Sequence, residues 1–370
     1  MVEPRLKSFL QISASLESRL GGPVAVVSGV QSHLKAEYNS RLIVIGSNDS
    51  EIDAIRIPSL LNNRYGIPNW FLKRSIVREI QQADFILIHG YYLFSTLLIV
   101  SIAQKSRVVI MPHGSLEEYQ QGVSRYRKWI FDQLIKNRLG RRKLHFFVAS
   151  KPEAKCISQR FPDSKVSIVG LGIPIESYRS ISARELHSPI NLLSFSRIAR
   201  KKRIDLSIRA VKILRDKGIN VRLEICGQGE KSLLIELQNI VSELGIEAFV
   251  KFRGHVDPSS FREVFQQSDI LLLPSENENF AVAVAEALAH DVPTVVSKYV
   301  AMHEFVLRNR TGIVLQTLTL EELVASVVNV IENYEQYVRN TSICKFELGW
   351  NNVFPNWISE IEETMSAQLE

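Results

Sequence analysis

The chain has 370 residues, 45% of them hydrophobic and 23% charged, with a net charge of +6. Its length exceeds the size at which one hydrophobic core usually stops growing, so two domains are expected, and its composition argues against a disordered chain or an integral membrane protein. Cys156, Cys226 and Cys344 are widely separated and lack zinc-site spacing, which is typical of reduced thiols in a cytosolic protein. The first residues lack the long apolar segment of a secretory signal, so export is not expected.

Short β-rich runs alternate with helical patterns along the whole chain, and this alternation predicts parallel α/β sheets. Most neighbouring runs are separated by enough chain for a crossover helix, so each half is expected to form its own doubly wound sheet. The expected strands are FLQIS (9–13), RLIVIG (41–46), DFILIHG (84–90), RVVIMPHG (107–114), HFFVAS (145–150), KVSIVG (165–170), INLLSFS (190–196), VRLEICG (221–227), FVKFRG (249–254), DILLLPS (269–275), PTVVS (293–297) and GIVL (312–315).

The boundary between the halves is expected within Gly170–Pro189, where prolines and serines interrupt the alternation. We therefore predict an N-terminal domain at residues 1–175, a C-terminal domain at 190–345, and a final helical segment at 346–370 that packs back toward the N-terminal domain. The apolar run Leu93–Ala103 is too short to cross a bilayer and predicts a buried helix.

In open α/β sheets ligands bind beyond the carboxyl ends of the strands, so the loops that follow strands are candidate sites. Gly21 and Gly22 follow the first strand and open a helix, where they either let a backbone approach a ligand or form a simple turn. His89 and His113 each end a buried strand and precede a glycine. Either imidazole can donate to a hydroxyl or phosphate, or take a proton near neutral pH, and the sequence leaves open which one faces a cleft.

The basic surplus is concentrated in Tyr119–Phe146, which carries eight Lys or Arg and one Asp, interleaved with apolar residues at helical spacing. This pattern is typical of a helix at a membrane surface, and also of a surface helix that packs its apolar side on its own domain. The residues to which we assign membrane binding are Arg138, Arg141, Arg142 and Lys143.

In the second half, Arg197 and Lys202 lie on a loop after a strand, where they either grip two phosphates of one ligand or form a solvated basic loop. The stretch SENENFAVAVAEALAHD (275–291) places Glu278 and Glu286 on either side of seven uncharged residues. A carboxylate in such apolar company is costly unless a polar group meets it. We expect ENEN (276–279) to form a turn and FAVAVAEALAH (280–290) to form a helix, which places Glu278 at the helix entrance and Glu286 two turns further in, about 12 Å away.

That separation exceeds the spacing of paired carboxylates in glycoside hydrolases, so it favours two carboxylates that hold opposite ends of an elongated, hydroxyl-bearing ligand. The backbone amides between them suit a diphosphate, because a helix amino terminus favours negative charge. These amides belong to Asn279, Phe280, Ala281 and Val282.

The stretch PSENENFAVAVAEALAHDVPTVVS resembles the two-glutamate motif of the retaining glycosyltransferases of family 4. Supporting motifs occur in the family's order, namely RLGGP, PHGSLEE, SRIARKK, ICGQGE, FRGHV and TGIVL. The resemblance covers nearly the whole chain. It implies the α/β GT-B fold, in which two Rossmann-like, doubly wound domains face each other with the active site in the cleft between them.

The resemblance also implies residue roles. Glu286 would bind the ribose hydroxyls, Glu278 the donor sugar, and His113 would lie by the anomeric carbon, so His113 and Glu278 are the expected catalytic residues. Arg197 and Lys202 would hold the diphosphate with the amides of Phe280, Ala281 and Val282. The remaining implied donor-site positions are Gly21 and Gly22 below the phosphates or the acceptor, His255 and Val256 at the base, and Asn279. Asn279 and Ala281 stand where the family often has glycine, which leaves the donor's identity open.

The function implied is transfer, with retention, of a hexose or N-acetylhexosamine from a nucleotide sugar, UDP-linked, to a hydroxyl of a glycan in lipopolysaccharide, O-antigen or other surface polysaccharide assembly. Neither a metal nor another cofactor is expected. The expected partners are the nucleotide sugar, a glycan acceptor carried on a lipid diphosphate, and an anionic membrane surface, which places the protein in the cytoplasm at the inner face of the cell membrane.

Two alternatives stay open. One is a soluble sugar synthase or phosphorylase of the same fold, which would need no membrane patch. The other is a basic nucleic-acid-binding module, although the chain shows no recognised nucleic-acid motif and we expect no nucleic-acid partner.

Overall fold

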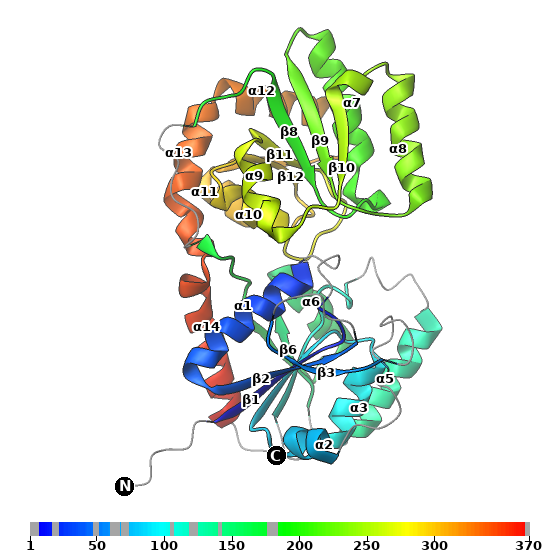
Figure 1. The fold of residues 1–370 in the computed structure, drawn as a ribbon, viewed down its shortest axis with the longest axis vertical. Coiled ribbons are helices and arrows are strands. Elements are labelled where there is room, and N and C mark those ends of the chain that lie inside the picture. The colour runs from blue at the N-terminus through cyan, green and yellow to red at the C-terminus, as the bar shows by residue number, and fades with distance from the viewer. Residues whose placement is uncertain are drawn as a thin grey trace. The chain divides into compact units, whose positions relative to one another are not determined.

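The computed structural model describes residues 7–16, 22–46, 52–59, 67, 74–103, 107–117, 125–139, 143–175 and 184–366. The chain divides into two compact units. Unit 1 contains Met1–Gly172 and Trp350–Glu370, and unit 2 contains Ile173–Gly349. Each unit has its own parallel sheet flanked by helices (Figure 1).

Unit 1 has a seven-stranded sheet in the order β3-β2-β1-β4-β5-β6-β7. The strand order reverses at β1, so the switch point of this doubly wound sheet lies between β1 and β4. The strands are β1 Ser8–Ser13, β2 Asn39–Ile45, β3 Ile55–Ile57, β4 Phe85–His89, β5 Arg107–Met111, β6 His145–Val148 and β7 Lys165–Ile168, and the helices are α1 Gly22–Glu37, α2 Arg74–Gln82, α3 Phe94–Ile102, α5 Arg125–Leu139, α6 Lys151–Arg160 and α14 Trp350–Ser366.

Unit 2 repeats the arrangement with six strands in the order β10-β9-β8-β11-β12-β13, so its switch point lies between β8 and β11. The strands are β8 Ile190–Phe195, β9 Val221–Cys226, β10 Val250–Gly254, β11 Ile270–Leu273, β12 Thr294–Ser297 and β13 Gly312–Leu315. The helices are α7 Ile204–Asp216, α8 Lys231–Glu243, α9 Phe261–Gln266, α10 Val282–Ala289, α11 His303–Asn309, α12 Leu320–Glu332 and α13 Tyr334–Cys344, with short 3-10 turns η3 Arg200–Lys202, η4 Glu247–Phe249, η5 Pro258–Ser260 and η6 Lys345–Leu348.

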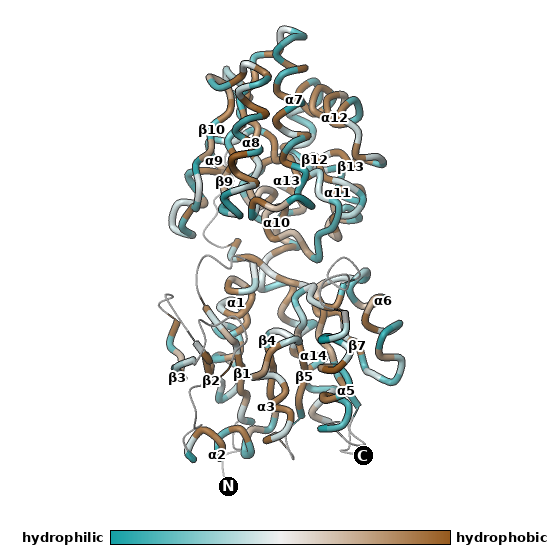
Figure 2. Tube along the Cα trace, turned by 90° about the vertical axis from the view of Figure 1, so that its right-hand side faces the viewer, coloured by the Kyte–Doolittle hydropathy of each residue, from teal (hydrophilic) through white to brown (hydrophobic). Residues whose placement is uncertain are grey.

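The central strands are mostly apolar because helices cover both faces of each sheet. Every residue of β4 and of β11 is buried. In unit 2 the two faces form separate cores, one under α7, α8 and α12 and the other under α9, α10 and α11. Figure 2 shows the hydrophobic residues concentrated in the strands and on the inward sides of the helices.

The last helix, α14, belongs to unit 1 and lies beside α1 (Figure 1). Trp357 is fully buried and donates to the Gly170 carbonyl at 3.2 Å. Trp350 packs so closely on Gly29 and Gly172 that an added Cβ would lie 2.3 and 2.5 Å from its ring, so only glycine fits at either position. These contacts bind the end of the chain to unit 1.

The predicted α/β class and all twelve predicted strands are confirmed, with ends shifted by a few residues. The buried helix predicted at Leu93–Ala103 is α3. β3 was not predicted, because a three-residue edge strand carries too little alternation of apolar and polar residues to be recognised in the sequence.

Candidate active site

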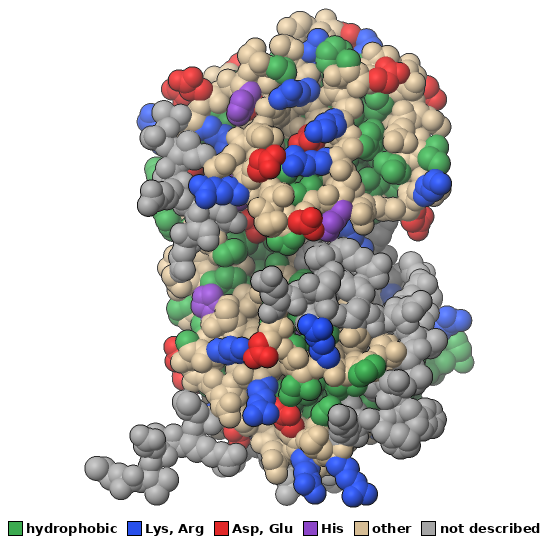
Figure 3. Space-filling view, in the orientation of Figure 1, with side chains coloured by type: hydrophobic (Ala, Val, Ile, Leu, Met, Phe, Trp, Pro, Cys, Tyr) green, Lys and Arg blue, Asp and Glu red, His purple; other side chains and the backbone are tan. Residues whose placement is uncertain are grey.

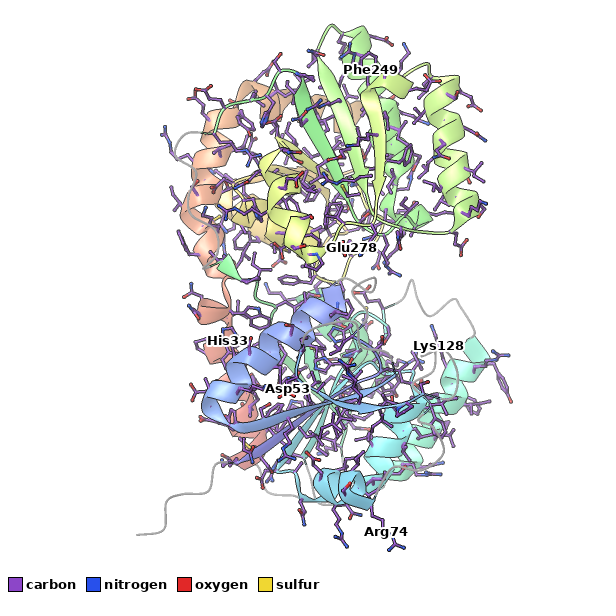
Figure 4. All side chains as sticks on the ribbon, in the orientation of Figure 1. His33, Asp53, Arg74, Lys128, Phe249 and Glu278 are labelled. Carbon is purple, nitrogen blue, oxygen red and sulfur yellow. The ribbon has the colours of Figure 1, made fainter. Side chains whose placement is uncertain are left out.

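The carboxyl ends of β8 and β11 form the first part of the site. These strands are neighbours at the centre of the unit 2 sheet, and they lead to η3 and α10. The loop after β8 carries Arg197 and Lys202, and the loop after β11 carries Glu278, which is labelled in Figure 4. The strand order therefore brings together two loops that are about eighty residues apart in sequence.

Lys202 and Glu278 form an ion pair between these loops, with Lys202 Nζ donating to Glu278 Oε1. Their side chains are only 10% and 13% exposed. Burial lowers the pKa of Lys202, the Glu278 carboxylate opposes that effect, and the positive charges of Lys201 and Arg197 lower the pKa further. The residue assigned to the diphosphate thus contacts the residue assigned to the sugar directly.

Backbone bonds hold the two loops in place. The Glu276 amide donates to the Lys201 carbonyl at 2.7 Å, and Arg203 lies 3.5 Å from the Glu276 carboxylate. Glu278 is further fixed by the segment after β12, because its amide donates to the Tyr299 carbonyl at 3.1 Å and its carbonyl accepts from Ala301. These contacts hold both loops, and therefore the ion pair between them, in fixed positions.

Arg197 is exposed, in contrast to Lys202, and its charge acts on Lys202. Gly227, after β9, packs against the backbone of the loop that carries Arg197, and an added Cβ would lie 1.8 Å from the Ser196 carbonyl oxygen. Gly229 lies equally close to the Ile198 carbonyl oxygen, at 2.0 Å. These two glycines allow the β9 loop to pack directly against the loop that carries Arg197.

Glu286 lies within α10 and is 6% exposed. The predicted helix from Phe280 to His290 is wrong at its start, because α10 begins at Val282 and Ala281 adopts a left-handed conformation with φ 65°. Asn279 and Phe280 therefore precede the helix, and the 12 Å separation computed for a continuous helix does not apply to Glu278 and Glu286. The amides at the helix start are those of Ala281 and Val282.

His255 and Val256 follow β10. Val256 is buried in the same core as Ala281 and Val284, so this loop packs beside the start of α10. His255 is exposed, with its Nε2 3.5 Å from the Asp257 carboxylate. The roles assigned to both residues at the base stay predictions.

In unit 1 the structure joins the two histidines directly. His89 Nδ1 lies 2.9 Å from His113 Nε2, and the rings stack with centroids 5.2 Å apart. Burial lowers the pKa of His113 to about 4, and burial together with His113 holds the pKa of His89 well below its usual value. Both imidazoles are therefore neutral at pH 7. Gly22 is the first residue of α1, and Gly21 lies outside the described residues.

Glu153, which was not predicted from the sequence, holds the turn after His113. This carboxylate is 1% exposed and accepts from the amide of Gly114 at 2.7 Å and from the amide of Ala149 at 3.1 Å. It thereby ties the loop after β5 to the loop after β6. A glutamate in the first turn of α6, three residues after the N-cap Ser150, is an ordinary capping pattern, so its position alone did not reveal this role.

Three residues of the candidate loops, one in unit 1 and two in unit 2, have a left-handed backbone, which is costly for any residue other than glycine. They are His113 at φ 53°, Arg203 at φ 51° and Ala281 at φ 65°. Each lies in a loop just after the carboxyl end of a central strand. Such strain clusters at functional sites, because the surrounding structure must hold the residue in place.

The basic amphipathic stretch contains α5, which has two faces. Ile135 is buried, Phe131 packs on the unit 1 core, and Asp132 accepts from Arg160 at 3.1 Å. The opposite face exposes Tyr126 by 73% and Trp129 by 56%. One side of α5 therefore packs on its own unit, as expected for a surface helix. The other side exposes aromatic residues.

The basic residues around α5 have different surroundings. Lys128, labelled in Figure 4, lies over the Tyr92 ring at 5.1 Å. Arg138 is exposed and donates to Ser101 Oγ at 3.0 Å, and Lys143 is exposed. Arg141 and Arg142 lie outside the described residues. On the face of unit 2 seen in Figure 3, basic side chains are interspersed with acidic ones, and Glu224 pairs with both Lys251 and Arg253.

Among the described residues, no helix is long and apolar enough to cross a membrane. Within the same ranges, no group of three His, Cys, Asp or Glu side chains is placed to hold a metal ion.

Two doubly wound units, each with candidate residues at the carboxyl ends of its strands, are the architecture of the GT-B class of glycosyltransferases. Residues 11–177 match the family described as Glycosyltransferase Family 4, and residues 179–342 match the family described as Glycosyl transferases group 1. The chain therefore belongs to the group 1, family 4 glycosyltransferases, and the family predicted from the sequence is confirmed.

One curated relative is the amylovoran biosynthesis glycosyltransferase AmsK of Erwinia amylovora, which is 29% identical over 164 residues. The match spans 43% of this chain and 40% of AmsK. Another is the putative colanic acid biosynthesis glycosyltransferase WcaL of Escherichia coli, 23% identical over 41% of this chain and 38% of WcaL. The chain thus aligns with about two fifths of the length of each.

Solved structures match over nearly the whole chain. Anabaena HepE in complex with UDP and glucose has a TM-score of 0.75 and 16% identity, covering 96% of this chain and 100% of HepE. At this identity the similarity shows the fold alone, and it confirms the two-domain GT-B fold.

Proposed function

We propose that this protein is a retaining glycosyltransferase that moves a hexose or N-acetylhexosamine from a UDP-sugar to a hydroxyl of a glycan acceptor. It acts in the cytoplasm, at the inner face of the cell membrane, in the assembly of a surface polysaccharide whose growing chain is carried on a lipid diphosphate. The family membership supports transfer, and the polysaccharide pathways named for AmsK and WcaL support the acceptor class.

The observation that carries the donor site is the buried Lys202–Glu278 pair at the switch point of unit 2. A cation and a carboxylate in contact serve the two ends of a sugar diphosphate, since the ammonium binds phosphate oxygens and the carboxylate accepts from sugar hydroxyls. While no donor is bound, the positive charge of Lys202 and the negative charge of Glu278 compensate each other, so both side chains can stay buried. A bound diphosphate takes over Lys202 and frees Glu278 for the sugar.

The chemistry is electrostatic. As the bond between the anomeric carbon and the diphosphate breaks, negative charge grows on the phosphate oxygens, and Lys202, Arg197 and the amides of Ala281 and Val282 stabilise it. Glu286 anchors the ribose and so fixes the diphosphate in line with these groups. The acceptor hydroxyl then attacks the face from which the diphosphate departs. The bridging oxygen leaves with UDP, which receives the acceptor's proton, and this step requires neither a metal nor a covalent nucleophile.

The proposal is tested by incubating the protein with a panel of nucleotide sugars without acceptor, because glycosyltransferases of this kind slowly hydrolyse their own donor. We expect release of UDP from one UDP-sugar, unchanged by EDTA. Hydrolysis of a sugar linked to another nucleoside diphosphate would correct the base. No hydrolysis and no nucleotide binding across the panel would overturn the function.

The membrane surface is proposed to contact α5 and the residues after it. The exposed aromatic side chains Tyr126 and Trp129 stack with centroids 6.1 Å apart, which suits the interfacial region of a bilayer. Arg138 and Lys143 add charge that anionic headgroups attract. A soluble synthase or phosphorylase would have no use for this face.

Replacing Arg138 and Lys143 with Gln is expected to weaken binding to anionic liposomes about 30-fold, since each basic residue near such a surface contributes about 1 kcal/mol. The matched control is Arg74→Gln with Arg78→Gln, which removes the same charge from the exposed side of α2. Co-sedimentation across a salt series measures both variants, and Trp129→Ser tests the aromatic contribution. Equal losses in the two double variants would mean that net charge, and no particular face, accounts for binding.

A further inference from the structure

A row of buried polar side chains crosses the interior of unit 1 and ends at His113. It begins at Ser40 in β2, continues through Gln31 in α1 and Gln11 in β1, and reaches His89 at the end of β4. Gln11 is fully buried and Gln31 is 2% exposed. A glutamine in the middle of a central strand is costly unless every polar atom is bonded, so this row calls for an explanation.

The contacts in the row are continuous. Gln11 Nε2 donates to Gln31 Oε1 at 2.6 Å, and Gln11 Oε1 lies 2.8 Å from His89 Nε2. On the far side of the same ring, His89 Nδ1 lies 2.9 Å from His113 Nε2. Each group thus has one partner on either side, and the donors and acceptors must alternate along the whole row.

The direction of this alternation is set at the Ser40 end. The Gln31 amide nitrogen faces the Ser40 backbone carbonyl at 3.4 Å, while its oxygen accepts from Ser40 Oγ at 3.1 Å. A carbonyl oxygen can only accept, so the reverse orientation of the Gln31 amide would place two oxygens against each other. The outer anchor is therefore a backbone atom that no side-chain replacement removes.

With the orientation of the Gln31 amide fixed, the donor and acceptor atoms of the other residues in the row can be assigned one after another. Since Gln31 Oε1 accepts from Gln11, the Gln11 oxygen is left to accept from His89 Nε2–H. His89 is neutral, because burial and the neighbouring His113 lower its pKa, so its Nδ1 carries no proton and accepts. His113 Nε2 must then be the donor, and in a neutral His113 the remaining nitrogen, Nδ1, carries a lone pair.

His113 Nδ1 makes no hydrogen bond to any residue that the structure describes, and the residue itself is partly exposed. Its turn is held by Glu153 through the Gly114 amide and by a left-handed backbone. The loop thus fixes the position of the His113 imidazole, and the polar row fixes which of its nitrogens carries the proton.

We propose that Gln11 and Gln31 are positioning residues which, through His89, hold His113 in the Nε2–H tautomer and so present Nδ1 as a hydrogen-bond acceptor for a hydroxyl group of the substrate. The identity of that hydroxyl rests on the proposed function, whereas the tautomer does not. The opposite tautomer would present an N–H at the same place and would favour a phosphate or carbonyl oxygen instead.

The test is imidazole nitrogen NMR on protein labelled with ¹⁵N-histidine, with His113→Gln used to assign the signals. In the wild type at pH 7 we expect Nε2 of His113 to be protonated and Nδ1 to be bare. Gln11→Met and Gln31→Met keep the side-chain length but remove the amide that fixes the order of hydrogen-bond donors and acceptors along the row. A mixture of the two His113 tautomers is therefore expected in each variant. Ser40→Ala is the matched control, because it removes the hydroxyl and keeps the anchoring carbonyl.

The same variants are assayed for nucleotide-sugar hydrolysis. The kcat of Gln11→Met and Gln31→Met is expected to fall at least about 10-fold with little change in KM, while Ser40→Ala stays near the wild type. A protonated Nδ1 in wild-type His113, or an unchanged tautomer in both Met variants, would overturn the inference. The NMR result stands without any turnover, so a failure of the proposed function is seen separately, as absent hydrolysis by the wild type.

Discussion

Glu278→Gln is expected to lower the turnover of the UDP-sugar about 100- to 1000-fold while leaving UDP binding undiminished. The carboxylate is proposed to meet the sugar and the positive charge that develops on it, an interaction made chiefly in the transition state. The structure adds a reason for retained UDP affinity, because the substitution frees Lys202 from its ion pair and leaves it available to the diphosphate.

Glu286→Gln is the comparison, since it changes the same chemical group eight residues further along the chain, inside α10. It is expected to weaken UDP itself by roughly 1.5 to 3 kcal/mol, the usual strength of hydrogen bonds to a charged group. Calorimetry with UDP and steady-state hydrolysis rates measure both variants. Loss of UDP binding in Glu278→Gln, with normal binding in Glu286→Gln, would show that the donor lies the other way round.

Lys202→Met is expected to weaken UDP binding about 10- to 100-fold and to leave uridine binding nearly unchanged, because only UDP carries the phosphates that the ammonium grips. It also leaves the Glu278 carboxylate buried without its cation, which costs about 3 kcal/mol of stability. The double variant Lys202→Met with Glu278→Gln removes that penalty, so its melting temperature should recover while its UDP affinity stays low.

Arg200→Gln provides the control for this experiment. Arg200 lies in the same 3-10 turn, two residues from Lys202, but its side chain is 72% exposed and its guanidinium pairs with Glu236 at 2.7 Å. Its replacement should leave UDP binding unchanged. Equal losses for UDP and uridine in Lys202→Met would instead mean that this turn only supports the fold.

The fold was readable from the sequence because the strands of doubly wound sheets are continuous apolar runs. DILLL and FILIH are examples, and each became a fully buried strand. The candidate loops were readable for the same reason, since a ligand site is expected wherever such a run ends. Among the described strands, the short edge strand β3 lacked this signal.

Three features of the site could not be read in this way. The Lys202–Glu278 contact joins residues 76 positions apart, and it follows from the strand order that makes β8 and β11 neighbours. The start of α10 was placed too early because alanine is a strong helix former, whereas Ala281 is held in a left-handed turn. Gln11 carried a signal that was overlooked, a lone amide inside the apolar strand FLQIS.

The central claim is transfer with retention from a UDP-sugar, and proton NMR of donor hydrolysis tests it most directly. The accepted UDP-α-sugar is incubated with the protein without acceptor, and the sugar signals are followed before the anomers equilibrate. We expect UDP and the α anomer to be released first, and Glu278→Gln to release neither at a comparable rate. Release of the β anomer first, or hydrolysis that is unchanged in Glu278→Gln, would contradict the account.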